Sequence, residues 1–336
     1  MNSFGKNFTL HIFGESHGPA VGIIIDGCPA GLSLKEEDFF EDIERRKGGI
    51  QKGTTARQED DRPVFLSGLF NGKTTGTPLT IIFENKNIRS ADYEKQRAIP
   101  RPGHADFVAT KKYAGYEDYR GGGHFSGRLT VCLVAAGVVA KRILAAAQPD
   151  PQIVLKASIL EIGGETDLDK GLQTAIAAND SIGGIVECVV TNLPIGLGEP
   201  FFDSAESLVS HAVFSIPAIK GIEFGSGFAA AKMKGSEHND ALENKEGKNF
   251  TNHAGGISGG LTNGNELVFR VVVKPTSSTA ATQQTLNVET GVVEALSVKG
   301  RHDLCIALRV PVVLEAVTAC VLVDLLAAEQ KLKPVL

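Results

Sequence analysis

The chain has 336 residues, a formal net charge of −5, and 42% hydrophobic and 22% charged residues, an ordinary globular composition with length for one or two domains. The acidic balance argues against non-specific binding of nucleic acid. A chain without tryptophan and with only 6% aromatic residues also lacks base-stacking platforms. We therefore expect basic clusters to be local sites, with no nucleic-acid partner.

The cysteines and the N-terminal segment indicate a cytoplasmic protein. No two cysteines form a C-x-x-C pair, so we expect buried thiols in a reducing compartment, without metal or disulfides. The N-terminal segment has no long apolar stretch and no cleavage site. The most apolar run, Leu129–Ala140, is shorter than the roughly 20 residues that a membrane span needs. The cysteines are Cys28, Cys132, Cys188, Cys305 and Cys320.

The first half of the chain predicts mainly strands before one long helix. Ser33 is the expected N-cap of a helix over Leu34–Arg46, because acidic residues fill its first turn. Lys47–Arg62 is polar and rich in glycine, which predicts a loop. Ser126–Ala147 predicts a helix that is apolar nearly all round and therefore buried between layers. Strands are expected at Phe8–Ile12, Val21–Asp26, Val64–Leu69 and Leu79–Phe83, and a short helix at Ala105–Lys112.

The second half alternates strands and helices and ends in a helix over Val310–Ala328, with Pro311 allowed in its first turn. Gly235–His253 reads as a loop. These patterns predict a mixed α/β (α+β) fold with helices inside or against sheets. We expect one domain over residues 1–336, in which two halves, about 1–150 and 151–336, could share an architecture. Further strands are expected at Ile153–Ile162, Ile185–Asn192, Gly221–Phe224 and Glu266–Val273, and helices at Asp167–Ala178 and Asp203–Val213.

Three familiar motif patterns are incomplete. GLFNGKT (Gly68–Thr74) is one residue too short for a P-loop and predicts a turn between strands. GSGFAA (Gly225–Ala230) fits a dinucleotide pattern, but no acidic residue closes a second strand, so a bulged strand is favoured. GESHG (Gly14–Gly18) fits the serine-hydrolase elbow, yet barely one strand precedes it. We expect this last segment to be a loop that presents Ser16 and His17 to a cleft.

Several polar segments suit an anionic ligand. Arg101–Arg128 combines five cations with three consecutive glycines and leads into an apolar helix, which offers positive charge and bare backbone N–H groups. A second cationic stretch, Arg45–Arg57, either completes this site or forms a solvated helix end. Asn252–Gly260 resembles a backbone nest, and Lys274–Ser278 adds a cation and three hydroxyl groups.

Three histidines lie in polar loops beside an arginine or a glycine turn. They are His17, His104 and His302. A histidine near a bound phosphate is well placed as a general acid. Asp303 could act as a base or orient one; pairing with Arg301 or capping a turn is an equally open interpretation.

Six motifs in one order resemble the chorismate synthase family: FGESHG, RPGHADF, YRGGGHFSGR, NHAGGISGG, KPTSS and KGRHDLC. The resemblance implies a β-α-β sandwich, a homotetramer and a requirement for reduced FMN. It also implies a 1,4-anti elimination of phosphate from 5-enolpyruvylshikimate 3-phosphate, which gives chorismate. That substrate carries two carboxylates and a phosphate, and guanidinium groups bind such anions bidentately.

The resemblance also implies residue roles. His17 would protonate the departing phosphate, His104 would keep the reduced flavin in the right protonation state, and Asp303 with the flavin N5 atom would help to remove the C6 proton. The anions of substrate or flavin would be held by Arg46, Lys52, Arg101, Arg128 and Arg301. The flavin would lie against His124, Phe125, Ser126, Pro217, Ala218, Gly259, Lys274, Pro275, Thr276, Ser277 and Ser278.

The chain departs from the family pattern at three places. His124-Phe125 replaces Arg-Ala or Arg-Ser, Lys52 replaces an arginine, and Pro217 stands where some members have asparagine. Each departure changes the chemistry of one expected ligand contact. Because no extra domain or convincing dinucleotide fingerprint is present, we expect an external flavin reductase, with NADPH only as an indirect electron source. A serine hydrolase using Ser16 and a non-catalytic flavin- or nucleotide-binding protein are the alternatives.

Overall fold

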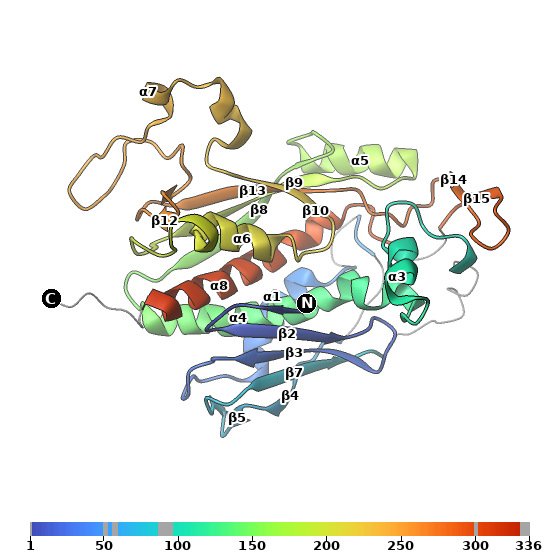
Figure 1. Ribbon diagram of the computed structural model, residues 1–336, viewed down its shortest axis with the longest axis horizontal. Helices are drawn as coiled ribbons and strands as arrows, with labels where there is room; N and C mark the ends of the chain where they lie inside the picture. The colour runs from blue at the N-terminus through green and yellow to red at the C-terminus, as the bar shows by residue number, and fades with distance from the viewer. Residues whose placement is uncertain (1, 50–52, 56–59, 87–96, 299–301, 330–336) are drawn as a thin grey trace.

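Two antiparallel sheets enclose two apolar helices in the computed structural model (Figure 1). The structure describes residues 2–49, 53–55, 60–86, 97–298 and 302–329. This β-α-β layering confirms the predicted α+β sandwich. The grouping into one domain with two related halves stays a prediction.

The first sheet has the strand order β1-β2-β3-β7-β4. Alternation of apolar residues puts Val21, Ile23 and Ile25 of β3 on the inner face, where all three are fully buried. A separate hairpin of β5 and β6 turns at Asn71-Gly72, so the sequence prediction of a turn, and not a P-loop, is confirmed. The strands are β1 (Ser3–Phe4), β2 (Thr9–Gly14), β3 (Ala20–Asp26), β4 (Val64–Ser67), β5 (Leu69–Phe70), β6 (Lys73–Thr74) and β7 (Leu79–Glu84).

The second sheet has the order β10-β13-β9-β8. Val186, Cys188 and Val190 alternate along β9 toward the core. Between them Glu187 points outward and pairs with Arg270 of β13. This alternation is typical of a sheet with one buried and one exposed face. The strands are β8 (Val154–Ile162), β9 (Gly184–Thr191), β10 (Ile219–Phe224) and β13 (Leu267–Val273).

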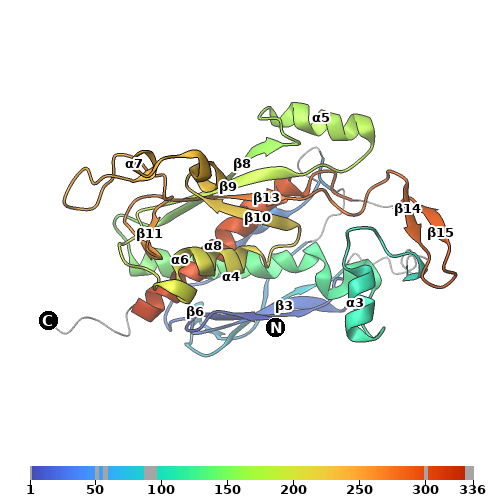
Figure 2. The same ribbon diagram turned by 45° about the horizontal axis from the view of Figure 1, so that its top comes forward.

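The helices α4 (Thr130–Ala147) and α8 (Val310–Glu329) lie between the sheets in both views (Figures 1 and 2). α4 packs on β3 and β7, and α8 packs on β8 and β9. A Cβ atom at Gly137 would lie 2.3 Å from the Ala316 Cβ, so glycine allows the two helices to touch. Both helices, taken with the turns before them, are long and apolar enough to cross a membrane by composition, but most of each is buried inside the protein.

An ion network around the buried carboxylates of Glu315 and Asp42 joins three helices and a strand. Arg45 of α1 (Phe40–Arg46) donates to both carboxylate oxygens of Glu315, at 2.7 and 2.8 Å. Lys141 binds Glu315 and Asp42, and the Ala157 N–H completes the set. Arg45 remains exposed at the end of α1, but its guanidinium is paired with Glu315 and it does not line the anion site described below.

Two local predictions are wrong. Ser33 does not cap α1, because its backbone bridges to Lys73; the helical segment starts later, with the Lys35 N–H bound to the Asp38 carboxylate. GSGFAA is not a bulged strand. β10 ends at Phe224, and the next residues turn into the short helix η6 (Gly227–Lys232).

Several short elements were not predicted. At the end of the proposed nest, β11 (Ile257–Ser258) and the following β12 (Leu261–Thr262) form a hairpin whose two turn glycines both have positive φ. The glycines there make a turn between strands. Further unpredicted elements are β14 (Gln283–Leu286), β15 (Val293–Leu296) and α7 (Gly235–His238). The predicted helices appear as α3 (Asp106–Tyr113), α5 (Leu168–Ala178) and α6 (Ala205–Val213).

Candidate active site

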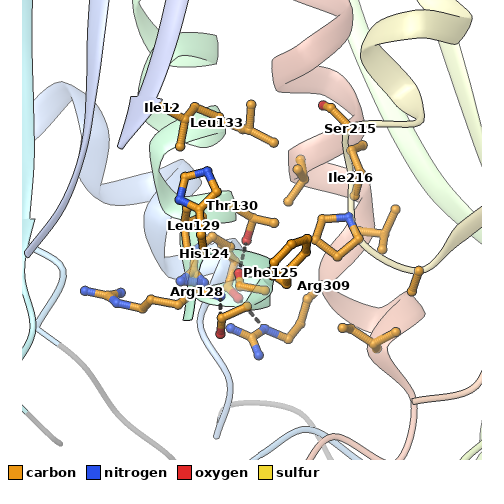
Figure 3. Close-up of a pocket in the computed structure, with 18 of the residues that line it drawn as sticks. Ile12, His124, Phe125, Arg128, Leu129, Thr130, Leu133, Ser215, Ile216 and Arg309 are labelled. Atoms are coloured by element: carbon orange, nitrogen blue, oxygen red, sulfur yellow. Dashed lines mark hydrogen bonds between the residues drawn. The ribbon is translucent and has the colours of Figure 1, made fainter. Parts of the chain in front are cut away.

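One cavity of about 980 Å³ lies beside the first turns of α4 and α8 (Figure 3). His17, His104 and Asp303 all line it, although they come from distant parts of the chain. The cavity is polar at one end, around Arg128 and Arg309, and apolar at the other, around Ile12 and Leu133. The predicted convergence of the three residues on one cleft is confirmed.

The three-glycine run fits against both histidines. A Cβ atom at Gly121 would lie 2.2 Å from His17 Cε1, and one at Gly122 would lie 3.0 Å from His104 Cε1. All three glycines have positive φ, which L side chains rarely adopt. The run therefore acts as a close-fitting wall that fixes the two imidazole rings on one side of the cavity.

Arg101, His104 and Asp106 form a closed cluster. The Arg101 Nε and Nη2 atoms donate to the two Asp106 carboxylate oxygens at 2.7 and 2.8 Å, and Nη1 donates to Ser278 Oγ at 3.0 Å. His104 Nδ1 lies 2.5 Å from Asp106 Oδ1. Burial alone would raise the pKa of Asp106, but the hydrogen bonds from Arg101 and His104 hold this pKa well below its usual range. Asp106 stays ionised and orients the ring of His104.

Arg46 and Arg128 share the carboxylate of Asp61 at the polar end. Arg128 donates to Asp61 Oδ1, whereas Arg46 Nη2 is 3.6 Å from Asp61 Oδ2. The Nε and Nη1 atoms of Arg46 are buried and have no hydrogen-bond partner among the described residues. Burial, together with the nearby positive charge of Arg309, lowers the pKa of Arg46 to about 9. This guanidinium is the best-placed receiver for an anionic ligand.

Asp303 is held by two donors that the sequence did not reveal. Its Oδ1 accepts from the Thr55 N–H at 2.9 Å, and its Oδ2 accepts from Arg309 Nη1 at 3.0 Å. Arg309 also donates to the Arg46 backbone oxygen at 2.7 Å and so ties Asp303 to the anion receiver. The signal that could have found Arg309 is its place directly before α8 and six residues after Asp303.

The segment predicted to hold flavin crosses the cavity wall. Lys274 Nζ donates to Ser277 Oγ at 2.7 Å, and Ser277 Oγ donates to the Gly103 carbonyl at 2.7 Å, which joins KPTSS to RPGHADF. His124 Nδ1 lies 2.8 Å from the Gly14 carbonyl oxygen, so this ring nitrogen is already engaged by the backbone. The predicted flavin contacts that line the cavity are His124, Phe125, Ser126, Pro217, Ala218, Lys274, Thr276, Ser277 and Ser278.

Two predicted site residues, Gly259 and Pro275, are not among the described residues that line this cavity. Gly259 belongs to the β11–β12 turn, and Pro275 is also outside the described lining. Lys52 and Arg301 lie outside the described residues. Thr55, Asp61, Asn85 and Arg309 lie at or beside the site and were not predicted from the sequence.

The comparisons with known proteins agree with the motif order. The model of the family described as chorismate synthase matches residues 8–327. A curated chorismate synthase of Chitinophaga pinensis is 67% identical over 331 residues, covering 98% of this chain and 98% of the relative. The chain belongs to the chorismate synthase family.

More distant members of this family agree. A chorismate synthase of Korarchaeum cryptofilum is 45% identical, with 96% of each chain covered. A crystal structure of chorismate synthase has a TM-score of 0.73 at 26% identity, covering 96% of this chain and 92% of that one. The chain is thus a carbon–oxygen lyase that eliminates phosphate from 5-enolpyruvylshikimate 3-phosphate to give chorismate, and the family requires reduced flavin for this reaction.

Proposed function

We propose that the cavity holds reduced FMN and 5-enolpyruvylshikimate 3-phosphate together, and that His17, His104 and Asp303 carry the proton chemistry. The observation that carries the proposal is Arg46, a buried cation whose Nε and Nη1 have no partner among the described residues. A volume of about 980 Å³ is at the upper end of the ~300–1,000 Å³ usual for one ligand. It leaves room for a cofactor and a small substrate.

The lining fits a flavin at the apolar end and the substrate anions at the polar end. Leu133, Ile216 and Val313 offer apolar surface to a planar ring system. Lys274 and the hydroxyl groups of Ser277 and Ser278 suit the polar groups of a cofactor. When bound, the reduced flavin supplies electron density transiently and recovers it, so the elimination has no net redox change.

The protein residues then divide the proton work. His17 donates a proton to the departing phosphate, because a leaving group of this charge departs more readily when it is neutralised. Asp106 and Arg101 orient His104 at the flavin. Asp303 accepts the substrate proton, and the Thr55 N–H and Arg309 aim its carboxylate. Arg46 and Arg128 bind the substrate anions. The Asp61 carboxylate faces both guanidinium groups and offsets part of their positive charge.

The proposal extends to the setting of the enzyme. We place it in the cytoplasm as a homotetramer that receives reduced FMN from a separate flavin reductase, with NADPH as the indirect electron source. Within a tetramer, Gly259 and Pro275 could meet flavin across a subunit contact. The native mass of the purified protein and its NADPH consumption without added reductase check these two points.

Anaerobic phosphate release with photoreduced FMN and the substrate tests the function. We expect release with reduced FMN, none with oxidised FMN under air, and tighter binding of reduced than oxidised FMN. His17→Ala and Asp303→Asn should lower the rate by roughly 10²–10⁴. His11→Ala is the control, because His11 is exposed on the same strand that leads to His17. No phosphate release with reduced FMN, or near-normal rates in both variants, would contradict the proposal.

A further inference from the structure

Asn85 follows the last residue of β7 and is buried, with 8% of its surface exposed. It is not one of the residues that line the main cavity. Its side-chain hydrogen bonds to the described residues nevertheless go to the loop of His17 or to Arg128.

The carboxamide of Asn85 spans the turn that carries His17. Its Nδ2 donates to the Glu15 carbonyl at 3.0 Å and to the Gly18 carbonyl at 2.8 Å. The Gly18 N–H also returns to the Glu15 carbonyl at 3.1 Å, so Ser16 and His17 are the central residues of a tight turn. One amide group thus holds both ends of this turn.

The other end of the same carboxamide binds a cation of the site. Arg128 Nε donates to Asn85 Oδ1 at 3.0 Å, while Arg128 Nη1 donates to Asp61. These contacts consume the acceptor and both N–H groups of Asn85. Rotation of the amide would break every one of them, because it would turn N–H groups toward Arg128 and an oxygen toward two carbonyl oxygens.

We propose that Asn85 is a positioning residue that sets the place of His17 relative to Arg128, and hence the place of the acid relative to the bound anion. The proposal rests on the roles proposed above for His17 and Arg128. A reacting group displaced by about 1 Å can lose roughly 10² in rate. A single rigid amide between acid and anion clamp is a direct means of preventing such a displacement.

The substitution Asn85→Asp tests the contact with the His17 loop separately from the contact with Arg128. The variant keeps an oxygen for Arg128 but replaces the two N–H donors with an oxygen that faces the Glu15 and Gly18 carbonyls. We expect kcat for phosphate release to fall by about 10- to 100-fold. The affinity for inorganic phosphate, measured by calorimetry, should fall less than it does in Asn85→Ala after allowance for the added negative charge, which is measured by its salt dependence, because Arg128 keeps an oxygen partner.

Asn192→Asp is the matched control. Asn192 Nδ2 also donates to a backbone carbonyl, that of Gln152 at 2.7 Å, but Asn192 is exposed and outside the cavity lining. Its replacement should leave both kcat and phosphate affinity unchanged. Asn85→Ala is the second variant and should lower both, since it removes the loop contact and the Arg128 contact together.

The decisive measurement repeats Asn85→Asp in a His17→Ala background. If Asn85 acts by placing His17, the second substitution should add less than about twofold to the loss, because residues that act as a unit are not additive. An equal further loss in that background would overturn the proposal.

A readout without turnover keeps this test separate from the proposed function. The ring signals of His17 in the NMR spectrum, assigned by their loss in His17→Ala, should shift in Asn85→Asp and Asn85→Ala but not in Asn192→Asp. Unmoved His17 signals would overturn the role of Asn85 even in an active enzyme. Shifted signals in a protein that releases no phosphate would contradict only the proposed function.

Discussion

Two buried arginines of the same cavity, Arg101 and Arg46, are used in opposite ways. Their exposed fractions are 8% and 3%. Arg101 places its guanidinium in a fork on Asp106 and a further bond on Ser278. Arg46 leaves Nε and Nη1 without a hydrogen-bond partner in the described part of the chain. Arg101 therefore makes its contacts within the protein, whereas Arg46 keeps two hydrogen-bond donors for a bound ligand.

The difference between Arg101 and Arg46 shows which of the two can gain a partner when an anionic ligand binds. A buried charge is tolerable when hydrogen bonds and an opposite charge offset its lost hydration. Arg101 meets this condition through Asp106. Arg46 does not, which is why burial lowers its pKa to about 9. An incoming carboxylate or phosphate would supply the missing partner, so an unfavourable feature of the ligand-free protein becomes favourable on binding.

The largest effect should come from replacing each arginine with methionine. Arg101→Met leaves the half-buried Asp106 without its main partner, and we expect a loss of about 3 kcal/mol in the free energy of unfolding, at the low end for a broken buried pair. Arg46→Met removes a poorly paired charge, so stability should be unchanged or higher by about 1–4 kcal/mol, while the KM for substrate rises. For each variant, denaturant unfolding measures the change in stability, and steady-state kinetics measure the change in KM. Equal destabilisation by the two substitutions would refute the contrast.

The second prediction concerns the wall beside the histidines. Gly121→Ala would place a Cβ atom 2.2 Å from His17 Cε1 at a positive φ, so we expect kcat to fall by about 10² as His17 moves. Gly164→Ala is the control for backbone strain. Gly164 also has a positive φ, but an added Cβ there meets no atom within 4 Å.

Gly164→Ala should lower stability by about 1 kcal/mol and leave kcat unchanged. If Gly121→Ala lowers only stability, to the same degree, then the glycine run serves the backbone alone and does not place His17.

The smallest effect should appear in the acid dependence of stability. The pKa of Asp106 is lower in the folded protein than its ordinary value of 3.8. Its pairing therefore stabilises the fold fully above that value, and the contribution is lost as the pH falls through the lowered folded pKa. Each unit of lowering corresponds to about 1.4 kcal/mol.

Asp106→Asn tests this dependence. The difference in unfolding free energy between wild type and variant should be largest near neutral pH and should narrow below pH ~4. Asp240→Asn offers a comparison at another carboxylate of lowered pKa, outside the cavity lining, and should leave phosphate release unchanged. A difference that stays constant down to pH ~2 would mean that Asp106 contributes packing and not charge.

The hydrogen-bond partners of the site residues, which lie far away in the sequence, show which parts of the site could be predicted. The motif residues His17, His104 and Asp303 carry recognisable local patterns, and the prediction that they share a cleft is confirmed. Their partners carry no such pattern. Thr55 and Asp303 are 248 positions apart, and Asn85 is 67 positions from Gly18. No local rule of spacing relates residues at such separations.

The amino-acid sequence by itself determined the family, the two apolar core helices and the alternating strands, because hydrophobic periodicity and motif order are written along the chain. Only the tertiary structure decided that the Arg101 guanidinium is hydrogen-bonded within the protein, while Arg46 Nε and Nη1 have no hydrogen-bond partner among the described residues. It also decided that three glycines serve as a wall for two histidines, and that Asn85 joins acid to cation. These properties depend on which donors and acceptors meet after folding, and a buried polar group takes its role from the partners it finds there.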